Sequence, residues 1–466
     1  MANVEDYDIV VLGSGAAGKL LAWTLGSEGK RVAVIERKYV GGACPNIACL
    51  PSKNLVHSAK VASYFHRRKE FGIAAPEQAI DMVAVRERKR TMVKRLVDVH
   101  LHNYKSSGAE LVMGQGRFLA PMTIQVQLNT GETRTLRGKT IIINTGSRAR
   151  IDATTGLSDA RPLTHVEALE LDRVPEHLIV LGGGYVGLEF AQAFRRLGSR
   201  VTIVDRNPAL LHHEDADVSE AIEQLFKDEG IAVATGTVVH GVEGTSGKSV
   251  LLRVARGAME DAIEGTHLLV AGGRTPNTDG IGLETVGIET DSHGHIKVNA
   301  RRETTVKDVL AVGDCAGGPY FTHISENDFH ILRENLAGGN RVTTGRQVPF
   351  CLFIDPELAR VGLTEREANA RGIPYRLAKI PMAQVLRTHT LSETRGFLKA
   401  LVEANGEYIL GVTAFGVDAG ELLPAVQVVM SAGLPYTVLR DTIIAHPTIA
   451  EGLGGLFAAT FSVPTA

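Results

Sequence analysis

The stretch Tyr7-Asp8-Ile9-Val10-Val11-Leu12-Gly13-Ser14-Gly15-Ala16-Ala17-Gly18 decides the fold of the first part of the chain. Residues 7–12 are mostly apolar, as in a buried parallel strand, and an apolar helix pattern then runs to about Ser27. A second strand follows at Val32–Ile35 and is closed by Glu36, roughly 20 positions after the glycines. A G-x-G-x-x-G turn between a strand and a helix, with this trailing acidic residue, predicts a dinucleotide-binding βαβ unit.

Each part of this unit has a physical role. The glycines permit a tight turn and let the backbone approach a pyrophosphate, and the N-terminus of the helix supplies N–H donors. Glu36 can accept a hydrogen bond from a ribose hydroxyl.

A second unit of the same kind begins with the strand His177–Leu181. The turn Gly182-Gly183-Gly184-Tyr185-Val186-Gly187 and a helix follow, and the next strand, Val201–Val204, ends at Asp205. One such turn alone would be weak evidence. Two turns, each between a strand and a helix and each with a trailing acidic residue, predict two bound dinucleotides.

Two cysteines lie in the run Gly41-Gly42-Ala43-Cys44-Pro45-Asn46-Ile47-Ala48-Cys49-Leu50-Pro51-Ser52-Lys53, just after the first unit. A cysteine pair at this place suggests a disulfide that exchanges electrons with a bound cofactor. The run looks mostly helical, so we expect the sulfurs at a helix N-terminus, where the dipole and free N–H groups favour a thiolate.

The length, charge and cysteine content argue against a nucleic-acid-binding, a membrane-spanning or a secreted disulfide-rich protein. The 466 residues predict about three domains, and the net charge of −2 gives no reason to expect nucleic acid as a partner. Residues 1–6 are polar and run directly into the first strand, and no apolar stretch reaches about 18 residues. We therefore expect a cytoplasmic protein without a membrane span. Four cysteines are too few for a secreted disulfide scaffold.

The chain resembles the pyridine nucleotide-disulfide oxidoreductases, a family that includes dihydrolipoamide dehydrogenase, glutathione reductase and mercuric reductase. The family hallmark is Gly-Gly-x-Cys-x4-Cys-x3-Lys, and residues 41–53 match it. Ala43, Pro45 and Ala48 depart from the residues that are common in the family. Proline is tolerated in a first helical turn, so we expect these replacements to spare the disulfide.

The resemblance implies an α/β fold with two Rossmann-like domains, for FAD and NAD(P), and a C-terminal α+β dimerisation domain. The predicted domains are 1–147 (FAD, first part), 148–270 (NAD(P)), 271–343 (FAD, second part) and 344–466 (dimerisation).

The family also implies roles for the thiols and for two charged residues. Cys49 would lie against the flavin as the charge-transfer thiolate, and Cys44 would be the interchange thiol that attacks the substrate. Lys53 and Glu189 would pair beside the flavin N5, although a simple surface ion pair is the alternative from the residues alone.

His446 and Glu451 form the other half of the predicted site. A carboxylate that orients an imidazole makes a good general base, and in the family this histidine comes from the partner subunit of a homodimer. Thr448-x-x-Glu451 also has the pattern of a helix capping box, and both roles are compatible because a carboxylate has two oxygens.

The cofactors implied are FAD and either NADH or NADPH. Asp205 favours NADH because it can accept from the ribose 2′-hydroxyl, whereas the adjacent Arg206 could reach a 2′-phosphate. Tyr185 either covers the flavin or is a packed aromatic residue. No metal site is predicted. The implied cofactor-binding residues are Gly13, Gly15, Ala16, Ala17, Gly18, Glu36, Arg37, Gly42, Ala43, Lys53, Thr145, Gly146, Ser147, Gly182, Gly184, Tyr185, Val186, Gly187, Asp205, Arg206, Gly273, Arg274, Gly313 and Asp314.

The substrate is less constrained than the cofactors. The segments Val385–Gly396 and Phe321–Ser325 look most like mercuric-reductase-like members, which favours a reductase of a disulfide or related small molecule. No cysteine follows Cys351, whereas mercuric reductases end in a vicinal pair, so we expect weak or no Hg(II) reduction. Pro51-Ser52-Lys53 and Asp205 support the alternative of dihydrolipoamide dehydrogenase.

A second alternative is a flavin-binding scaffold without thiol chemistry. The intact Cys44–Cys49 pair, together with His446 and Glu451, argues against it.

Overall fold

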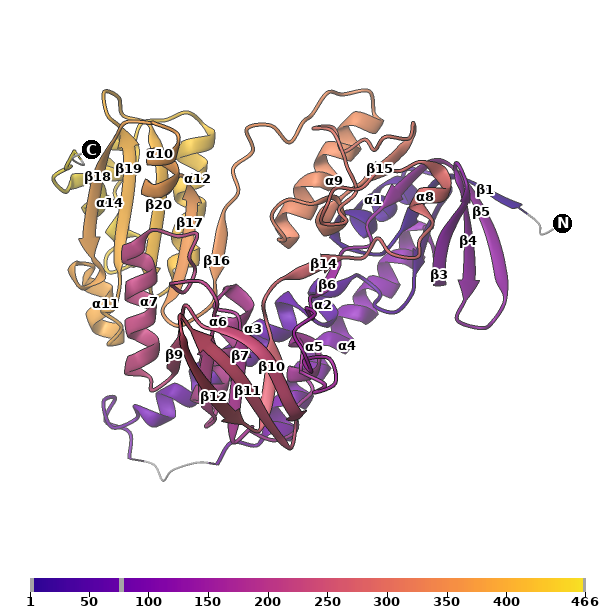
Figure 1. Cartoon of the computed structure of the whole chain (residues 1–466). Helices are drawn as coiled ribbons and strands as arrows, with labels where there is room; N and C mark the ends of the chain where they lie inside the picture. The colour runs from indigo at the N-terminus through magenta and orange to yellow at the C-terminus, as the bar shows by residue number, and fades with distance from the viewer. Residues whose placement is uncertain (1–3, 75–78, 464–466) are drawn as a thin grey trace.

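The computed structural model describes residues 4–74 and 79–463. Sheets of six, four and five strands form the centres of three units (Figure 1). A two-stranded sheet connects the first unit to the second, and a three-stranded sheet adds to the second unit. The expected α/β class, with a C-terminal α+β part, is confirmed. No helix among the described residues is both long and apolar enough to cross a membrane.

The first sheet is built from two separate segments of chain. Its parallel strands lie in the order β3-β2-β1-β5-β15, and β4 pairs antiparallel with both β3 and β5. The strands are β1 (Val4–Leu12), β2 (Val32–Glu36), β3 (Glu110–Ala120), β4 (Thr123–Leu128), β5 (Thr133–Ile143) and β15 (Val309–Ala311). The helices of this unit are α1 (Ala16–Ser27), α4 (Met82–Ser107), α8 (Leu283–Val286) and α9 (Thr322–Leu336), and the 3₁₀ turn η1 (Gly313–Ala316) follows β15.

The second unit repeats the arrangement with four parallel strands in the order β13-β7-β8-β9. These strands are β7 (His177–Leu181), β8 (Arg200–Val204), β9 (Ala232–Ala234) and β13 (His267–Val270). An antiparallel sheet adds β10 (Val238–Thr245), β11 (Ser249–Arg256) and β12 (Met259–Gly265), and the helices are α5 (His165–Ala168), α6 (Tyr185–Arg196) and α7 (Ala216–Asp228).

The two crossings between these units run side by side. β6 (Ser147–Ala149) leads from the first unit to the second, β14 (Arg274–Pro276) leads back, and the two strands pair antiparallel. The carboxyl ends of strands β5 and β15 therefore lie next to these two crossing strands.

The third unit has an antiparallel sheet in the order β16-β17-β20-β19-β18. Its strands are β16 (Phe350–Leu352), β17 (Glu357–Gly362), β18 (Tyr375–Pro381), β19 (Phe397–Glu403) and β20 (Ile409–Gly416). Its helices are α10 (Glu365–Ala370), α11 (Leu386–Leu391), α12 (Ala419–Ser431), α13 (Thr437–Asp441) and α14 (Glu451–Ala458), with the 3₁₀ turn η2 at Met382–Gln384.

The cysteine run differs in one respect from the expectation. It is not continuously helical: α2 (Ala43–Asn46) is a single turn, and the long helix α3 (Cys49–His66) begins at the second cysteine. The break lies at Ile47 (φ −140°) and Ala48 (φ −127°), whose backbone angles are not helical. Only Cys49 therefore lies at the N-terminus of a long helix.

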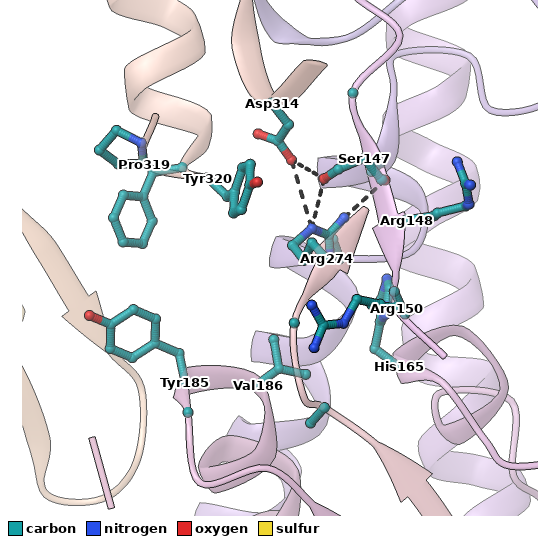
Figure 2. Close-up of a pocket in the computed structure, with 18 of the residues that line it drawn as sticks. Ser147, Arg148, Arg150, His165, Tyr185, Val186, Arg274, Asp314, Pro319 and Tyr320 are labelled. Atoms are coloured by element: carbon teal, nitrogen blue, oxygen red, sulfur yellow. Dashed lines mark hydrogen bonds and ion pairs between the residues drawn. The ribbon is translucent and has the colours of Figure 1, made fainter. Parts of the chain in front are cut away.

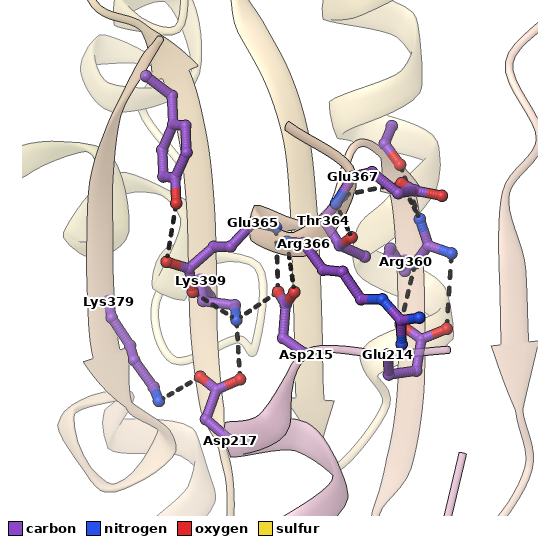
Figure 3. A network of polar contacts seen from close by, with 12 residues as sticks. Glu214, Asp215, Asp217, Arg360, Thr364, Glu365, Arg366, Glu367, Lys379 and Lys399 are labelled. Atoms are coloured by element: carbon purple, nitrogen blue, oxygen red, sulfur yellow. Dashed lines mark hydrogen bonds and ion pairs between the residues drawn. The ribbon is translucent and has the colours of Figure 1, made fainter. Parts of the chain in front are cut away.

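A buried ion-pair network ties the second unit to the third (Figure 3). The Lys399 ammonium, on β19, lies 2.7 Å from Asp215, 2.8 Å from Asp217 and 2.9 Å from Glu365. Lys399 is completely buried, and its charge lies where the three carboxylates converge. The network fixes the start of α7 against the C-terminal sheet.

Candidate active site

One cavity, of about 2090 Å³, connects both glycine turns, the cysteine run and the crossing strands. This volume is about twice the upper end of the range for a single small-molecule pocket, roughly 300–1,000 Å³. The cavity is large enough for two dinucleotides.

The first glycine turn is shaped to receive an anion. Gly13 has φ +102°, and a Cβ at this position would collide with the Asn144 carbonyl, so the turn requires glycine. α1 starts after Gly15 without a side-chain cap from that residue. The N–H groups of Ala17 and Gly18 are held by Ser325 and Asn144, whereas Gly15 and Ala16 line the cavity at the helix N-terminus. The buried Glu36 carboxylate accepts from the Ser14 hydroxyl at 2.7 Å and from its N–H at 3.0 Å.

The second glycine turn has the same arrangement, with a buried carboxylate bound to the turn and a helix that starts directly after it. Asp205 accepts from the Gly183 N–H at 2.5 Å through one oxygen and from the Asn207 N–H at 2.7 Å through the other. α6 likewise starts after Gly184 without a side-chain cap, and a Cβ at Gly184 would point into open space. Both turns therefore fit the pyrophosphate of a dinucleotide.

Most of the predicted site residues line this cavity together. They are Gly13, Gly15, Ala16, Glu36, Arg37, Gly42, Ala43, Cys44, Cys49, Lys53, Thr145, Gly146, Ser147, Gly182, Gly184, Tyr185, Val186, Glu189, Asp205, Arg206, Gly273, Arg274, Gly313 and Asp314. Ala17, Gly18, Gly187, His446 and Glu451 do not line it.

The third glycine of each turn contributes through packing. A Cβ at Gly18 would lie 2.8 Å from the Gly13 carbonyl oxygen, and a Cβ at Gly187 would collide with the Gly182 carbonyl. The N–H of Ala17 donates to the Ser325 hydroxyl at 3.2 Å. These residues hold each helix close to its strand.

The two thiols are free in the structure and differ in their surroundings. The Cys49 sulfur lies 3.3 Å from the Thr322 hydroxyl. A hydrogen bond from Cys44, aided by Thr322 and Lys53, lowers the pKa of Cys49 to about 6 against the effect of burial. The same bond to Cys49, together with burial, raises the pKa of Cys44. The arrangement favours a thiolate at Cys49.

Lys53 and Glu189 form the predicted pair. The Lys53 ammonium lies 2.6 Å from one Glu189 oxygen and 2.8 Å from the other. Glu189 is 6% exposed and also accepts from the Phe353 N–H at 3.0 Å. The pair lines the cavity beside the thiols rather than the outer surface.

A polar cluster lies where the crossing strands meet β15 (Figure 2). The Ser147 hydroxyl donates to Asp314, and the Arg274 guanidinium donates to the Ser147 hydroxyl at 2.7 Å and to its carbonyl at 3.0 Å. This holds the Asp314 carboxylate at the cavity wall, where it can accept from a sugar or ribityl hydroxyl.

Tyr185 lines the cavity and is also packed against other aromatic residues. Its side chain points into the cavity (Figure 2). The centre of its ring lies 5.2 Å from that of Phe350 and 6.2 Å from that of Phe321. Burial raises the pKa of Tyr185 to about 12, so the phenol is neutral near pH 7.

His446 and Glu451 contact each other away from the cavity. The His446 Nδ1 lies 3.0 Å from the Glu451 carboxylate, which also accepts from the Thr448 N–H at 2.9 Å. The predicted capping box is only half formed, because α14 starts at Glu451 and the Thr448 hydroxyl has no partner among the described residues. The His446 side chain is 61% exposed and does not line the cavity that holds its own chain's thiols.

Thr322 and Asn144 are site residues that the sequence did not reveal. Asn144 accepts from the Gly18 N–H at 3.0 Å and donates to the Val312 carbonyl at 3.0 Å, which joins α1, β5 and β15. Thr322 is 273 positions from Cys49, so no local pattern links them. The only signal was that Thr322 lies in the segment Phe321–Ser325.

Comparisons with known proteins agree with this geometry. Residues 7–328 match the pyridine nucleotide-disulphide oxidoreductase family, and residues 348–456 match the dimerisation domain of that family. The chain is 36% identical to the probable pyridine nucleotide-disulfide oxidoreductase RclA of Escherichia coli over 98% of this chain and 99% of RclA. It is 34% identical to dihydrolipoyl dehydrogenase of Thermus scotoductus, over 97% and 96% of the two chains, and 34% identical to mercuric reductase of Streptomyces lividans, over 98% and 96%.

A solved structure shows the same fold. The Cu(II) complex of the HOCl-induced flavoprotein disulfide reductase RclA from E. coli superposes with a TM-score of 0.88 at 34% identity, over 97% of this chain and 99% of that one. The glycine turns, the paired thiols and these similarities together place the chain in the pyridine nucleotide-disulfide oxidoreductases, a family of enzymes that use FAD and NAD(P).

Proposed function

We propose that this enzyme uses NADH to reduce a small disulfide through the Cys44–Cys49 pair, and that it works as a homodimer. Bound FAD supplies the two-electron transfer from NADH to the enzyme disulfide. The observation that carries the proposal is the placement of Cys49. Its sulfur lies beside Thr322 and Lys53 in the same cavity as both dinucleotide turns.

The two thiols have different tasks in the reduced enzyme. The Cys44 thiolate attacks one sulfur of the substrate, which forms a mixed disulfide and releases the other half as a thiolate. Cys49 then attacks the sulfur of Cys44, which releases the second half and restores the enzyme disulfide. The low pKa of Cys49 keeps this residue as the thiolate that the second attack requires.

Proton transfer is assigned to the histidine. His446 of the partner subunit takes the Cys44 proton and returns it to the leaving thiolate, and Glu451 orients the imidazole through Nδ1. The exposure of His446 and its absence from its own chain's cavity support this assignment.

We also propose the domain limits that were predicted from the sequence. They are 1–147 with 271–343 for FAD, 148–270 for NAD(P) and 344–466 for dimerisation.

The preference for NADH follows from Asp205. Its buried carboxylate places a negative charge at the end of β8, where a 2′-phosphate would be repelled and a 2′-hydroxyl could donate. Arg206 is exposed and next to it, so the ratio of kcat/KM for the two coenzymes tests this point directly. A higher kcat/KM with NADPH would overturn the preference.

The first experiment is an anaerobic titration of the purified protein with NADH, followed by absorbance. A long-wavelength charge-transfer band after two electrons per site shows the Cys49 thiolate beside oxidised flavin and supports the proposal. Direct bleaching without this band overturns it and favours the flavin-binding scaffold.

Substrate assays then separate the remaining candidates. Turnover of lipoamide favours dihydrolipoamide dehydrogenase, and turnover of small linear disulfides favours the proposed reductase. Cu(II) is the metal ion to assay first, because the similar RclA was solved as a Cu(II) complex. Location in the cytoplasm and weak or no Hg(II) reduction stay predictions.

Mixed dimers test the role of the partner subunit. Cys44→Ser and His446→Ala proteins are each expected to be inactive. A dissociated and reassociated equal mixture should regain about a quarter of wild-type activity, because half the dimers then hold one intact site. No recovery after proven exchange would overturn the assignment of His446 to the partner's thiols.

A further inference from the structure

The crossing strand β6 carries polar side chains to both nucleotide-binding units. Ser147, at its start, serves the first unit, where its hydroxyl donates to Asp314. Arg150 follows the end of this strand, and its N–H donates to the Gly273 carbonyl of the returning segment at 3.0 Å. Figure 2 shows the Arg150 side chain extending into the cavity on the side of Val186. The chain therefore places a cation where it enters the second unit.

Arg150 lacks a carboxylate partner, unlike the other two arginines of the crossing strands. Arg148 lies 2.6 Å from Asp279, and Arg274 lies 3.8 Å from Asp314. Within residues 4–74 and 79–463 no carboxylate lies within ion-pair distance of Arg150. Its positive charge is thus available to a ligand in the cavity.

Asp152 is the acidic residue closest to Arg150 along the chain, but it is engaged elsewhere. Its carboxylate accepts from the Thr154 hydroxyl at 2.6 Å and from the Thr154 N–H at 3.0 Å. The Thr154 hydroxyl is the main cause of the lowered pKa of Asp152, and the charge of Arg150 contributes less. Asp152 therefore does not neutralise Arg150.

Arg150 lies beside the second glycine turn. A Cβ at Gly182 would lie 2.6 Å from the Ala271 carbonyl oxygen and 3.0 Å from the Gly272 nitrogen, so the turn packs against this segment. A Cβ at the next residue, Gly273, would lie 3.9 Å from the guanidinium carbon of Arg150. The turn and the guanidinium thus approach one short segment and line one cavity.

His165 leaves a second polar group without a partner at the wall of this cavity (Figure 2). The residue is 7% exposed, and its Nε2 has no hydrogen-bond partner among the described residues. Buried polar atoms are normally hydrogen-bonded, so a ligand is expected to complete this one. Burial, and next the charge of Arg274, lower the pKa of His165 to about 4. The imidazole is therefore neutral near pH 7, and Arg150 supplies the positive charge.

We infer that Arg150 is a coenzyme-binding residue whose guanidinium pairs with the pyrophosphate of the nicotinamide dinucleotide on the second glycine turn. The turn and the N-terminus of α6 offer N–H groups, which bind phosphate oxygens without neutralising their charge. A guanidinium adds that charge and donates two parallel hydrogen bonds to a phosphate. The inference rests on the proposed use of a nicotinamide coenzyme, but not on the identity of the disulfide substrate.

Coenzyme binding to the oxidised holoenzyme tests this role without turnover. Isothermal titration calorimetry with NAD+ and with NADP+ gives the two dissociation constants. Arg150→Gln should raise both by about tenfold or more, because it removes hydrogen bonds to a charged group that the two coenzymes share. In the steady state, the KM for NADH should rise while kcat changes little.

Matched variants separate the charge from the fold. Arg150→Lys keeps the charge and should lose less affinity than Arg150→Gln. Arg150→Met keeps the aliphatic stem and should match Arg150→Gln, which covers the case in which the glutamine variant does not fold. Arg148→Gln lies two positions away, where the side chain is 49% exposed and paired with Asp279, and should leave both dissociation constants unchanged.

A hydride donor without phosphate separates coenzyme binding from the flavin site. Benzyl dihydronicotinamide carries no pyrophosphate, so it should reduce the flavin of wild type and of Arg150→Gln at the same rate in stopped-flow measurements. A slower reaction of the variant with this donor would show that the replacement disturbs the flavin site, and would count against the inference.

Two results of the calorimetry would overturn the inference. One is an unchanged pair of dissociation constants in Arg150→Gln. The other is a loss confined to NADP+, because it would place Arg150 on a 2′-phosphate instead. A wild-type holoenzyme that binds neither coenzyme would defeat the proposed function as well, whereas normal wild-type binding with unaltered variants defeats only this inference.

Discussion

The Lys53 ammonium lies 2.6 Å from the Glu189 carboxylate, and this ion pair joins α3, which begins at Cys49, to α6, which begins at Tyr185. The same carboxylate accepts from the Phe353 N–H at 3.0 Å, in the segment that leads into the C-terminal sheet. One buried carboxylate thus connects the thiols, the second nucleotide turn and the third unit.

Replacing Lys53 with methionine should destabilise the protein because Glu189 would be left buried without a counterion. Breaking a buried pair costs roughly 3–5 kcal/mol, and the partial exposure of Lys53 places this case at the low end of that range. Urea unfolding measures the loss. Lys53→Met/Glu189→Gln should recover part of it, and a double variant no more stable than Lys53→Met would show that the pair is not the cause.

Cys44→Ser should show the charge-transfer band without any reductant, because Cys49 can no longer form the disulfide. A hydrogen bond from Cys44 is the largest cause that lowers the pKa of Cys49, and Thr322 also lowers it. The serine hydroxyl of Cys44→Ser can donate in place of the thiol, so the thiolate should still predominate at pH 8 and be lost as the pH falls through the lowered pKa. Absorbance against pH measures this. Cys49→Ser is the control and should show no band at any pH. A Cys44→Ser band that is insensitive to pH between 5 and 8 would contradict the assignment.

Thr322→Val should raise the pKa of Cys49, because the hydroxyl 3.3 Å away no longer donates to the thiolate. A hydrogen bond to a charged group contributes roughly 1.5–3 kcal/mol, which corresponds to a rise of about one pKa unit or more. The same absorbance titration, made in the Cys44→Ser background, measures it. Thr322→Ser keeps the hydroxyl and should keep the original midpoint; equal midpoints for valine and serine would remove Thr322 from the site.

Lys399→Met should be strongly destabilising because three carboxylates converge on this buried ammonium (Figure 3). The expected loss is roughly 3–5 kcal/mol by urea unfolding at pH 7. Lys379→Met is the matched control on the neighbouring strand. The Lys379 side chain is 39% exposed and, among the described residues, forms an ion pair only with Asp217, so the replacement should cost less than about 1 kcal/mol.

The effect of Lys399 should also depend on pH. Burial raises the pKa of Asp217, but the ammonium groups of Lys379 and Lys399 outweigh it and hold the pKa below its usual value. A depressed folded-state pKa gives stability that is present above the unfolded pKa and is lost as the pH falls through the folded one. The difference between wild type and Lys399→Met should therefore shrink below about pH 4. A difference that stays constant to pH 3 would argue against an ionic origin.

Local patterns in the sequence determined the two nucleotide-binding turns and the cysteine run of this protein. The two glycine turns, the trailing acids Glu36 and Asp205 and the cysteine run each lie within about 30 consecutive residues, so the strand–turn–helix geometry is written in adjacent positions. These patterns predicted α1 to its last residue, Ser27, and β7 to both of its ends. Lys53 and Glu189 were predicted as a pair from the resemblance, and the structure shows their contact.

The tertiary structure alone decided which distant groups touch the reacting sulfurs. Thr322 reaches Cys49 across 273 positions. The tertiary structure also interrupts the helix expected over the cysteine run at Ile47. In the same way, only the folded chain places Lys399 among three carboxylates from two units. Hydrogen bonds and ion pairs act over a few ångströms in space regardless of separation along the chain. The sequence therefore determines the turns and the thiol pair, whereas the charges and donors that set the pKa of each thiol exist only in the folded protein.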